Sequence, residues 1–151
     1  MTARKFTATL IVAALALSVP VALLAAGTET PSGADNDSLT RARALIKEKD
    51  FGSAIPILTM VTSEDPRNAD AFNWLGYSLR KTGKYDAAET AYGKALSIDP
   101  AHKGALEYLG ELYVETKRPD KAREILARLS AACPGGCEEL EDLKEMIAKG
   151  N

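Results

Sequence analysis

The segment AFNWLGYSLRKTGKYDAAETAYGKALSIDP, residues 71–100, contains two amphipathic stretches separated by a turn. In its first half, small and apolar residues follow the i, i+3, i+4, i+7 spacing of one helix face: Phe72, Leu75, Gly76 and Leu79. The letters KTGK at 81–84 place a glycine where a helix typically ends. A second stripe begins at Tyr85 and stops at the pair DP of residues 99–100, since a proline disfavours helix in the residue before it. The segment therefore predicts a helix-turn-helix unit.

The same unit recurs with a period of 34 residues on both sides of this segment. Prolines share one register at Pro66, Pro100 and Pro134, and alanines share another at Ala54, Ala88 and Ala122. The dipeptide at Leu75-Gly76 returns at Leu109-Gly110. Self-similarity at a fixed period indicates stacked structural repeats, here at about 35–68, 69–102 and 103–136.

This spacing resembles the tetratricopeptide repeat (TPR) motif, in which an aromatic-x2-Leu-Gly-x2-Tyr pattern is followed by Ala-x3-Phe and a proline. The second unit matches it from Phe72 to Pro100, and the third from Leu106 to Pro134. The first unit matches less completely, as terminal repeats do when their outer face meets water. The resemblance covers residues 35 to 134 and implies an all-α fold, an α-solenoid of three helix-turn-helix TPR repeats (37–134) plus a C-terminal capping helix.

Small residues predict how closely the helices approach. We expect Gly76 and Gly110 to let the two helices of their unit come together, with Ala88 and Ala122 on the opposing helices. One helix pair cannot bury its apolar face alone, so a cap is needed after the third unit. Residues 137–149, CEELEDLKEMIAK, place apolar residues on one stripe and predict that capping helix.

The N-terminus has the layout of an export signal. Arg4 and Lys5 precede an uncharged, mostly apolar stretch that ends at Ala25-Ala26-Gly27. We expect residues 1–27 to be a signal peptide, or an uncleaved membrane anchor, because the apolar run is long for a signal core. Residues 28–36 are predicted to form a flexible linker. Either outcome predicts an exported protein, of the bacterial periplasm, tethered to the inner membrane if the signal is not cleaved.

Composition and charge argue against several classes of function. The net charge is -2, so the dense basic face that nucleic acid requires is not expected. His102 is the only histidine, and the sequence has neither a nucleophile–base motif nor a phosphate-binding glycine loop. We therefore expect no enzyme activity and no cofactor. The predicted partner is a protein or peptide, and the oligomeric state stays open.

The resemblance also implies which residues line the concave groove of the solenoid. On the basic side these are Arg43, Lys47, Arg80 and Lys81, with Asn73 and Tyr77 between, and on the acidic side Glu107, Glu111 and Glu115. Opposite charges at the two ends of a groove would orient an extended peptide. The alternative is that these are ordinary solvated charges of helix faces. Several positions of the family's clamp for chaperone C-terminal carboxylates hold other residues, so that specificity is not expected.

Two cysteines, Cys133 and Cys137, flank the sequence Pro-Gly-Gly between the last repeat and the predicted cap. In an oxidising compartment nearby cysteines usually pair, and a tight Pro-Gly-Gly turn would bring these two together. A disulfide closing so short a loop stabilises by about 2 kcal/mol in the chain-entropy model. The alternative function is a redox- or metal-handling accessory, since two thiolates also suit copper(I). The leading function remains an extracytoplasmic adaptor or assembly factor that binds its partner in the groove.

Overall fold

The computed structural model describes residues 32–150, which form seven helices and no strand. The helices are α1 (Ser32–Lys47), α2 (Phe51–Glu64), α3 (Ala69–Lys81), α4 (Tyr85–Ile98), α5 (Lys103–Glu115), α6 (Pro119–Ala132) and α7 (Glu138–Gly150). In this part of the chain no helix is both long and apolar enough to cross a bilayer. The predicted signal at 1–27 lies outside the described residues. Helix α1 begins at Ser32, inside the stretch predicted as a linker. Pro31 directly precedes the helix and no proline lies within it, so nothing in residues 32–36 prevents the helix from extending this far toward the N-terminus.

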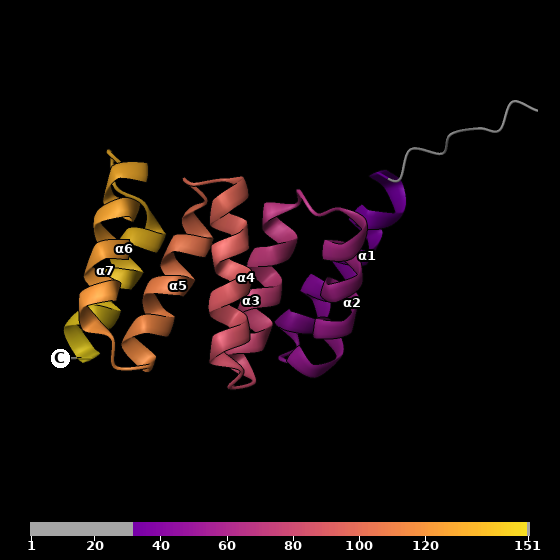
Figure 1. The fold of residues 1–151 in the computed structure, drawn as a ribbon, viewed down its shortest axis with the longest axis horizontal. Coiled ribbons are helices and arrows are strands. Elements are labelled where there is room, and N and C mark those ends of the chain that lie inside the picture. Colours follow the sequence, from indigo (N-terminus) through magenta and orange to yellow (C-terminus); the bar gives the residue numbers. More distant parts are fainter. Residues whose placement is uncertain (1–31, 151) are drawn as a thin grey trace, which may run out of the picture.

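The helices stack as three antiparallel pairs in one row (Figure 1). Helix α1 packs on α2, α3 on α4, and α5 on α6, while α3 and α5 join each unit to the one before it. Helix α7 packs on both α5 and α6 and closes the row. The predicted all-α TPR solenoid with a terminal cap is thus confirmed.

Each repeat turns between its two helices with the same backbone geometry. Gly83 has a φ of 76°, and the residues 34 positions away, Lys49 and Lys117, have φ values of 62° and 58°. In every case the amide after this residue donates to a carbonyl five residues earlier, as Lys84 does to Leu79. This is the hydrogen-bond pattern of a helix that ends in a left-handed residue. Glycine adopts it without strain, whereas two of the three repeats use lysine.

Close packing around Gly76 agrees with the sequence, but the packing around Gly110 corrects it. A Cβ on Gly76 would lie 2.7 Å from the ring of Tyr92, the fully buried tyrosine of α4 in the same unit. A Cβ on Gly110 would lie 2.5 Å from Leu143, which belongs to α7 and not to the second helix of its own unit. The cap therefore approaches the third repeat at the position where helix α5 has no side chain.

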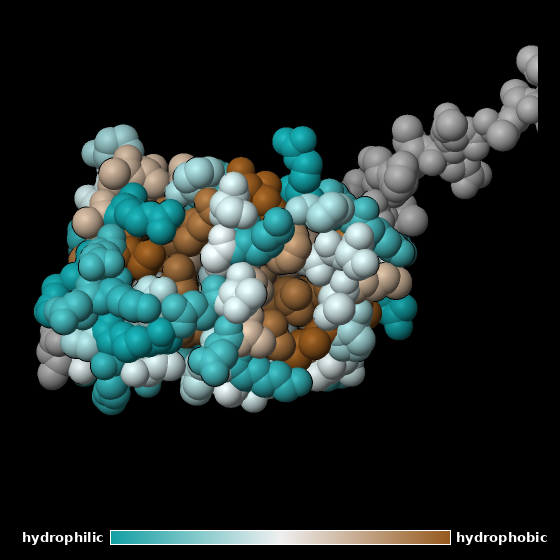
Figure 2. All heavy atoms as spheres, viewed as in Figure 1, coloured by the Kyte–Doolittle hydropathy of each residue, from teal (hydrophilic) through white to brown (hydrophobic). Residues whose placement is uncertain are grey.

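The core has two parts that follow the row. One cluster joins α4, α5, α6 and α7 around Tyr92, Leu112 and Leu143, and a smaller one joins α1 and α2 around Ala42 and Leu58. Figure 2 shows hydrophobic side chains between α2 and α4, where the first two units meet, and a more hydrophilic surface over α6. Stacking thus lets neighbouring units bury apolar surface that no single pair could bury.

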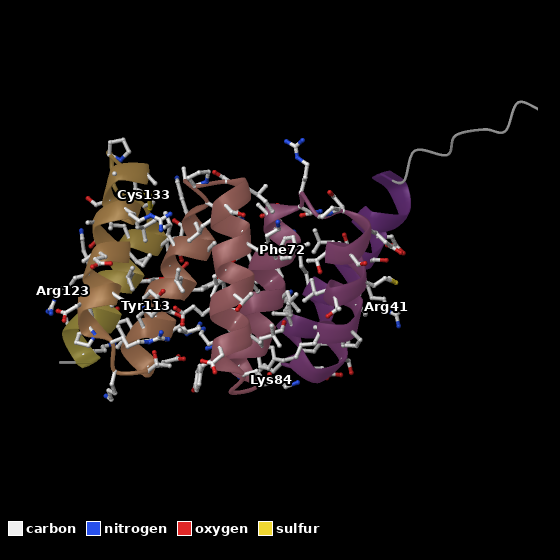
Figure 3. The ribbon with its side chains drawn as sticks, in the orientation of Figure 1. Arg41, Phe72, Lys84, Tyr113, Arg123 and Cys133 are labelled. Carbon is white, nitrogen blue, oxygen red and sulfur yellow. A yellow bond between two sulfur atoms is a disulfide. The ribbon has the colours of Figure 1, made fainter. Side chains whose placement is uncertain are left out.

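The end of α6 is joined to the start of α7 through sulfur. Cys133 lies at the end of α6 (Figure 3), and in the structure its sulfur is bonded to that of Cys137, with the two Cα atoms 5.9 Å apart. Cys133 is buried in the larger core cluster. In the structure this bond links the residue that follows α6 to the residue that precedes α7.

Candidate binding surface

A hollow of about 870 Å³ lies between α1, α2, α3 and α5. We call it the aromatic hollow, because four aromatic side chains line it: Phe51, Trp74, Tyr77 and Tyr108. Four cationic side chains also line it: Arg43, Lys47, Lys49 and Lys81. Among residues 32–150, no acidic side chain lines it. The surface therefore combines an apolar floor with positive charge.

The aromatic rings form one contiguous floor. Tyr77 is at its centre, with ring centroids 4.9 Å from Tyr108, 5.9 Å from Trp74 and 5.9 Å from Phe51. These rings are half-buried, so each still presents part of its surface to the hollow. Burial raises the pKa of Tyr77 above its ordinary value, although the nearby Arg80 opposes the shift. Aromatic side chains with one packed and one open face are typical anchors for a partner's apolar groups.

Cations surround this floor, and none of them pairs with a carboxylate among the described residues. The guanidinium of Arg43 lies 5.4 Å from the centre of the Trp74 ring, and the ammonium of Lys81 lies 5.3 Å from that of Tyr77. Lys47 and Lys81 are exposed. Within residues 32–150, none of the four cations of the hollow takes part in an ion pair. Their positive charge is therefore available to a partner.

Arg80 has a different role from the one predicted for it. The residue is only 3% exposed, and its guanidinium pairs with Glu111 at 2.5 Å and with Glu115 at 2.8 Å. Burial by itself lowers the pKa of Arg80, but Tyr92 and the two carboxylates hold it above its ordinary value. The predicted separation of a basic end from an acidic end is wrong for these three residues, because α3 and α5 of adjacent units lie close enough for Arg80 to reach both carboxylates.

A second recess of about 340 Å³ continues the groove between α3, α5 and α7. We call it the Asn73 pocket, and its own polar lining is Asp70, Asn73, His102, Glu107 and Glu139. Gly104 also lines it, and it shares Arg43, Trp74 and Tyr108 with the aromatic hollow. The groove thus changes from cationic at α1 to acidic at α7.

Glu107 is the most perturbed carboxyl of the groove. It is 8% exposed, and burial is the main reason that its pKa rises to about 8. The carboxylates of Glu111, Asp142 and Glu139 raise the pKa further, while Arg80 lowers it. Burial at this position therefore favours the protonated form of the carboxyl more than it does for an ordinary glutamate.

His102 is fully engaged at the entrance of the Asn73 pocket. Its Nδ1 accepts a hydrogen bond from the backbone N–H of Ala105, which caps the start of α5. Its Nε2 is therefore the nitrogen that donates to Asp70, at 3.0 Å. Sequence reasoning missed this role, although a histidine directly before an amphipathic helix is in the position of a cap.

The structure thus divides the nine groove residues predicted from the sequence. Four line the aromatic hollow (Arg43, Lys47, Tyr77 and Lys81), two line the Asn73 pocket (Asn73 and Glu107), and three form the internal ion pairs (Arg80, Glu111 and Glu115). The sequence did not predict that Lys49, Phe51 and Tyr108 also line the aromatic hollow. The available signal was the register, because Trp74 and Tyr108 are 34 residues apart.

Solved structures of the same fold cover nearly the whole described chain. The TPR2B domain of yeast Sti1, solved with pHsp70, has a TM-score of 0.71 at 16% identity, covering 78% of this chain and 98% of that domain. The second TPR domain of human RPAP3, solved with the HSP70 peptide SGPTIEEVD, has a TM-score of 0.69 at 20% identity, over 77% and 97%. The type III secretion translocator chaperone SycD of Yersinia enterocolitica has a TM-score of 0.73 at 15% identity, over 79% and 84%.

Sequence comparisons agree with the fold. Tetratricopeptide repeat protein 37 of Xenopus laevis is 28% identical over 87 residues, which is 58% of this chain but only 6% of that much longer protein. Two family models, both described as tetratricopeptide repeat, match residues 39–102 and 79–147. Together they span all three repeats and most of the cap, and the chain belongs to the tetratricopeptide repeat family.

Proposed function

We propose that this chain is a non-enzymatic binding module that holds a short segment of a partner protein in the aromatic hollow. The observation that carries the proposal is the combination of four half-buried aromatic rings with four cations that have no carboxylate partner among residues 32–150. A hollow of about 870 Å³ is large enough for several side chains of a peptide.

The chemistry of the hollow defines the segment it would take. Apolar or aromatic side chains would bury surface against Trp74, Tyr77 and Tyr108, and acidic side chains would pair with the surrounding cations. Proteins of the same fold provide a precedent, since the human RPAP3 domain was solved with the peptide SGPTIEEVD, in which three of the last four residues are acidic. The proposed ligand is therefore an acidic segment with at least one large apolar residue.

We place this activity outside the cytoplasm, as an adaptor or assembly factor. The support is the basic, then apolar, then small-residue order of residues 1–27. An oxidising compartment also suits a disulfide between Cys133 and Cys137.

The redox or metal-handling alternative lacks a specific observation in its favour. Cys133 is buried in the core, where an attacking thiolate or a metal ion has little access. Within the part of the chain that the structure describes, no group of three or more histidine, cysteine, aspartate or glutamate residues is arranged to hold a metal ion. The groove therefore remains the better-supported working surface.

Charge reversal in the hollow tests the proposal. The double variant Lys47→Glu/Lys81→Glu removes two exposed cations of the hollow, and Lys94→Glu/Arg128→Glu makes the same charge change at exposed positions on α4 and α6. Affinity capture from envelope extracts, with equal amounts of each purified chain, should recover about tenfold less partner with the first variant than with the wild type. The second variant should retain the partner.

Circular dichroism spectra of both variants should match the wild type, because all four positions are exposed. Equal recovery by the two variants, or loss only with the α4 and α6 variant, would move the binding surface away from the hollow.

A further inference from the structure

The Asn73 pocket brings hydrogen-bond acceptors together from three different helices. Asn73 belongs to α3, Glu107 to α5 and Glu139 to α7, and all three line the same recess. Because the helices are separate elements of a rigid stack, these acceptors are positioned by the fold and not by a flexible loop. This convergence is a property of the assembled repeats.

One of these acceptors is buried without a partner. Asn73 is 4% exposed, and its Oδ1 has no hydrogen-bond partner within residues 32–150. Buried polar atoms are nearly always paired, because leaving one unpaired costs the full loss of its hydration. The missing side chain of Gly104 makes room for this amide, since a Cβ there would lie 3.2 Å from Asn73 Nδ2. The pocket is therefore built around an acceptor that nothing in the described chain satisfies.

The carboxyl beside it is also without a cation. Glu107 is 8% exposed and forms no ion pair within the described residues. The charged groups that face it are Glu111 on its own helix, Asp142 and Glu139 on α7, and Arg80 on α3. Arg80 is occupied by Glu111 and Glu115. Within the described residues, the carboxyl groups around Glu107 therefore have no cation paired with them apart from Arg80.

The other basic groups of the pocket do not fill this role. His102 uses both ring nitrogens, one on the Ala105 amide and one on Asp70. Arg43 also lines the pocket, but its guanidinium lies over the Trp74 ring and forms no ion pair with the pocket's carboxylates among residues 32–150. A positive group from outside the described chain therefore fits the cluster.

We propose that the Asn73 pocket binds the ammonium group of a lysine side chain of the partner, held by Asn73 Oδ1, Glu107 and Glu139. An ammonium has three N–H donors, which match three convergent acceptors, whereas the planar fork of a guanidinium suits one carboxylate. The rings of Trp74 and Tyr108 at the junction with the aromatic hollow would cover the aliphatic stem. The absence of a metal-holding group among the described residues favours an organic cation over a metal ion.

This inference rests on the proposed function, because it specifies the second half of the segment that the groove would hold. Acidic and apolar residues would occupy the aromatic hollow, and a lysine further along would reach the Asn73 pocket. A groove that recognises both signs of charge in a fixed order also fixes the direction of the bound segment.

The test uses small probes, so it does not depend on finding the partner. N-acetyl-lysine-N-methylamide is titrated into the isotope-labelled protein, with the norleucine and arginine analogues in parallel. The side-chain amide of Asn73 and the backbone amide of Gly104 report on the pocket, and the pKa of Glu107 is followed by carbon NMR. We expect saturable shifts for the lysine probe, with a dissociation constant on the order of millimolar, and a lower pKa of Glu107 when the probe is bound.

Two variants make the result specific. Glu107→Gln should weaken lysine binding about fivefold or more, while Glu124→Gln, which removes an exposed carboxylate on α6, should leave it unchanged. Equal shifts with norleucine, tighter binding of the arginine probe, or an unchanged pKa of Glu107 at saturation would overturn the proposal. If Lys47→Glu/Lys81→Glu lost the partner but the wild-type protein did not bind the lysine probe, the proposed function would stand and the lysine site would be wrong.

Discussion

Arg80 on α3 and Glu111 on α5 are joined by an ion pair of 2.5 Å, although the arginine side chain is only 1% exposed. The pair connects the first helices of two successive repeats at the centre of the groove. Removing one partner leaves the other charge partly buried and unpaired, which is far more costly than the loss of a surface pair.

The first prediction is that Arg80→Ala lowers the free energy of unfolding by about 2–3 kcal/mol, which is at or below the lower end of the roughly 3–5 kcal/mol for fully buried pairs, because Glu111 and Glu115 keep some exposure. Urea unfolding followed by circular dichroism measures it. Arg123→Ala breaks an exposed pair with Asp120 and should change stability by less than about 0.5 kcal/mol. Equal effects of the two variants would mean that the Arg80 pairs are no stronger than surface contacts.

A second prediction concerns close helix approach. Gly76→Ala should destabilise by about 1–2 kcal/mol, because its Cβ would meet the fully buried ring of Tyr92 at 2.7 Å. Gly93→Ala should instead stabilise by roughly 0.5–1 kcal/mol, since nothing lies within 4 Å of that Cβ and alanine favours helix. Thermal and urea unfolding of both variants give the two signs. A stabilising Gly76→Ala would contradict the packing of α3 on α4.

The third prediction is the pH dependence due to Glu107. With a folded pKa of about 8 and an ordinary value of 4.5, the folded protein keeps a proton that the unfolded chain has lost between these values. Stability from this group therefore falls as pH rises through that window. Glu107→Gln should be more stable than wild type by roughly 1 kcal/mol at pH 9, after discounting for solvent screening, and the difference should vanish near pH 4.

Glu124→Gln serves as the control for that experiment, because Glu124 is exposed on α6. Its difference from the wild type should stay small at every pH. If the stability advantage of Glu107→Gln over the wild type grew as the pH was lowered, the pKa of Glu107 would be shifted in the opposite direction to the one assigned here.

A fourth prediction concerns Cys133 and Cys137. The purified protein should show no free thiol to an alkylating reagent until it is reduced, and reduction should lower the free energy of unfolding by about 2 kcal/mol. Under the same reductant the urea midpoint of Cys137→Ser should not move. Complete alkylation of the unreduced protein would show that Cys133 and Cys137 are not bonded to each other.

The sequence predicts most of the fold because one period specifies it three times. Pro66 and Pro100 follow the ends of α2 and α4, and Pro119 begins α6, where proline is tolerated. The period does not predict which residue other than glycine adopts the left-handed conformation at the turn. Lys49 and Lys117 adopt the left-handed conformation of Gly83, and nothing in their side chains signals it.

The site was predictable as a face of helices but not as a set of contacts. Register placed Tyr77 and Lys81 on the same helix face, and both line the aromatic hollow. It could not show that the distance between α3 and α5 lets Arg80 reach Glu111, because that distance depends on how the units stack. Nor could it show that Leu143 of α7, and not α6, fills the space above Gly110.

Position-specific photocrosslinking tests most directly whether the partner lies in the aromatic hollow. A benzophenone amino acid replaces Lys47, which lines the hollow, or Lys94, which is exposed on α4. Irradiation in the presence of the partner should give a covalent adduct from position 47 and little or none from position 94. An adduct that forms only from position 94 would contradict the groove as the binding surface.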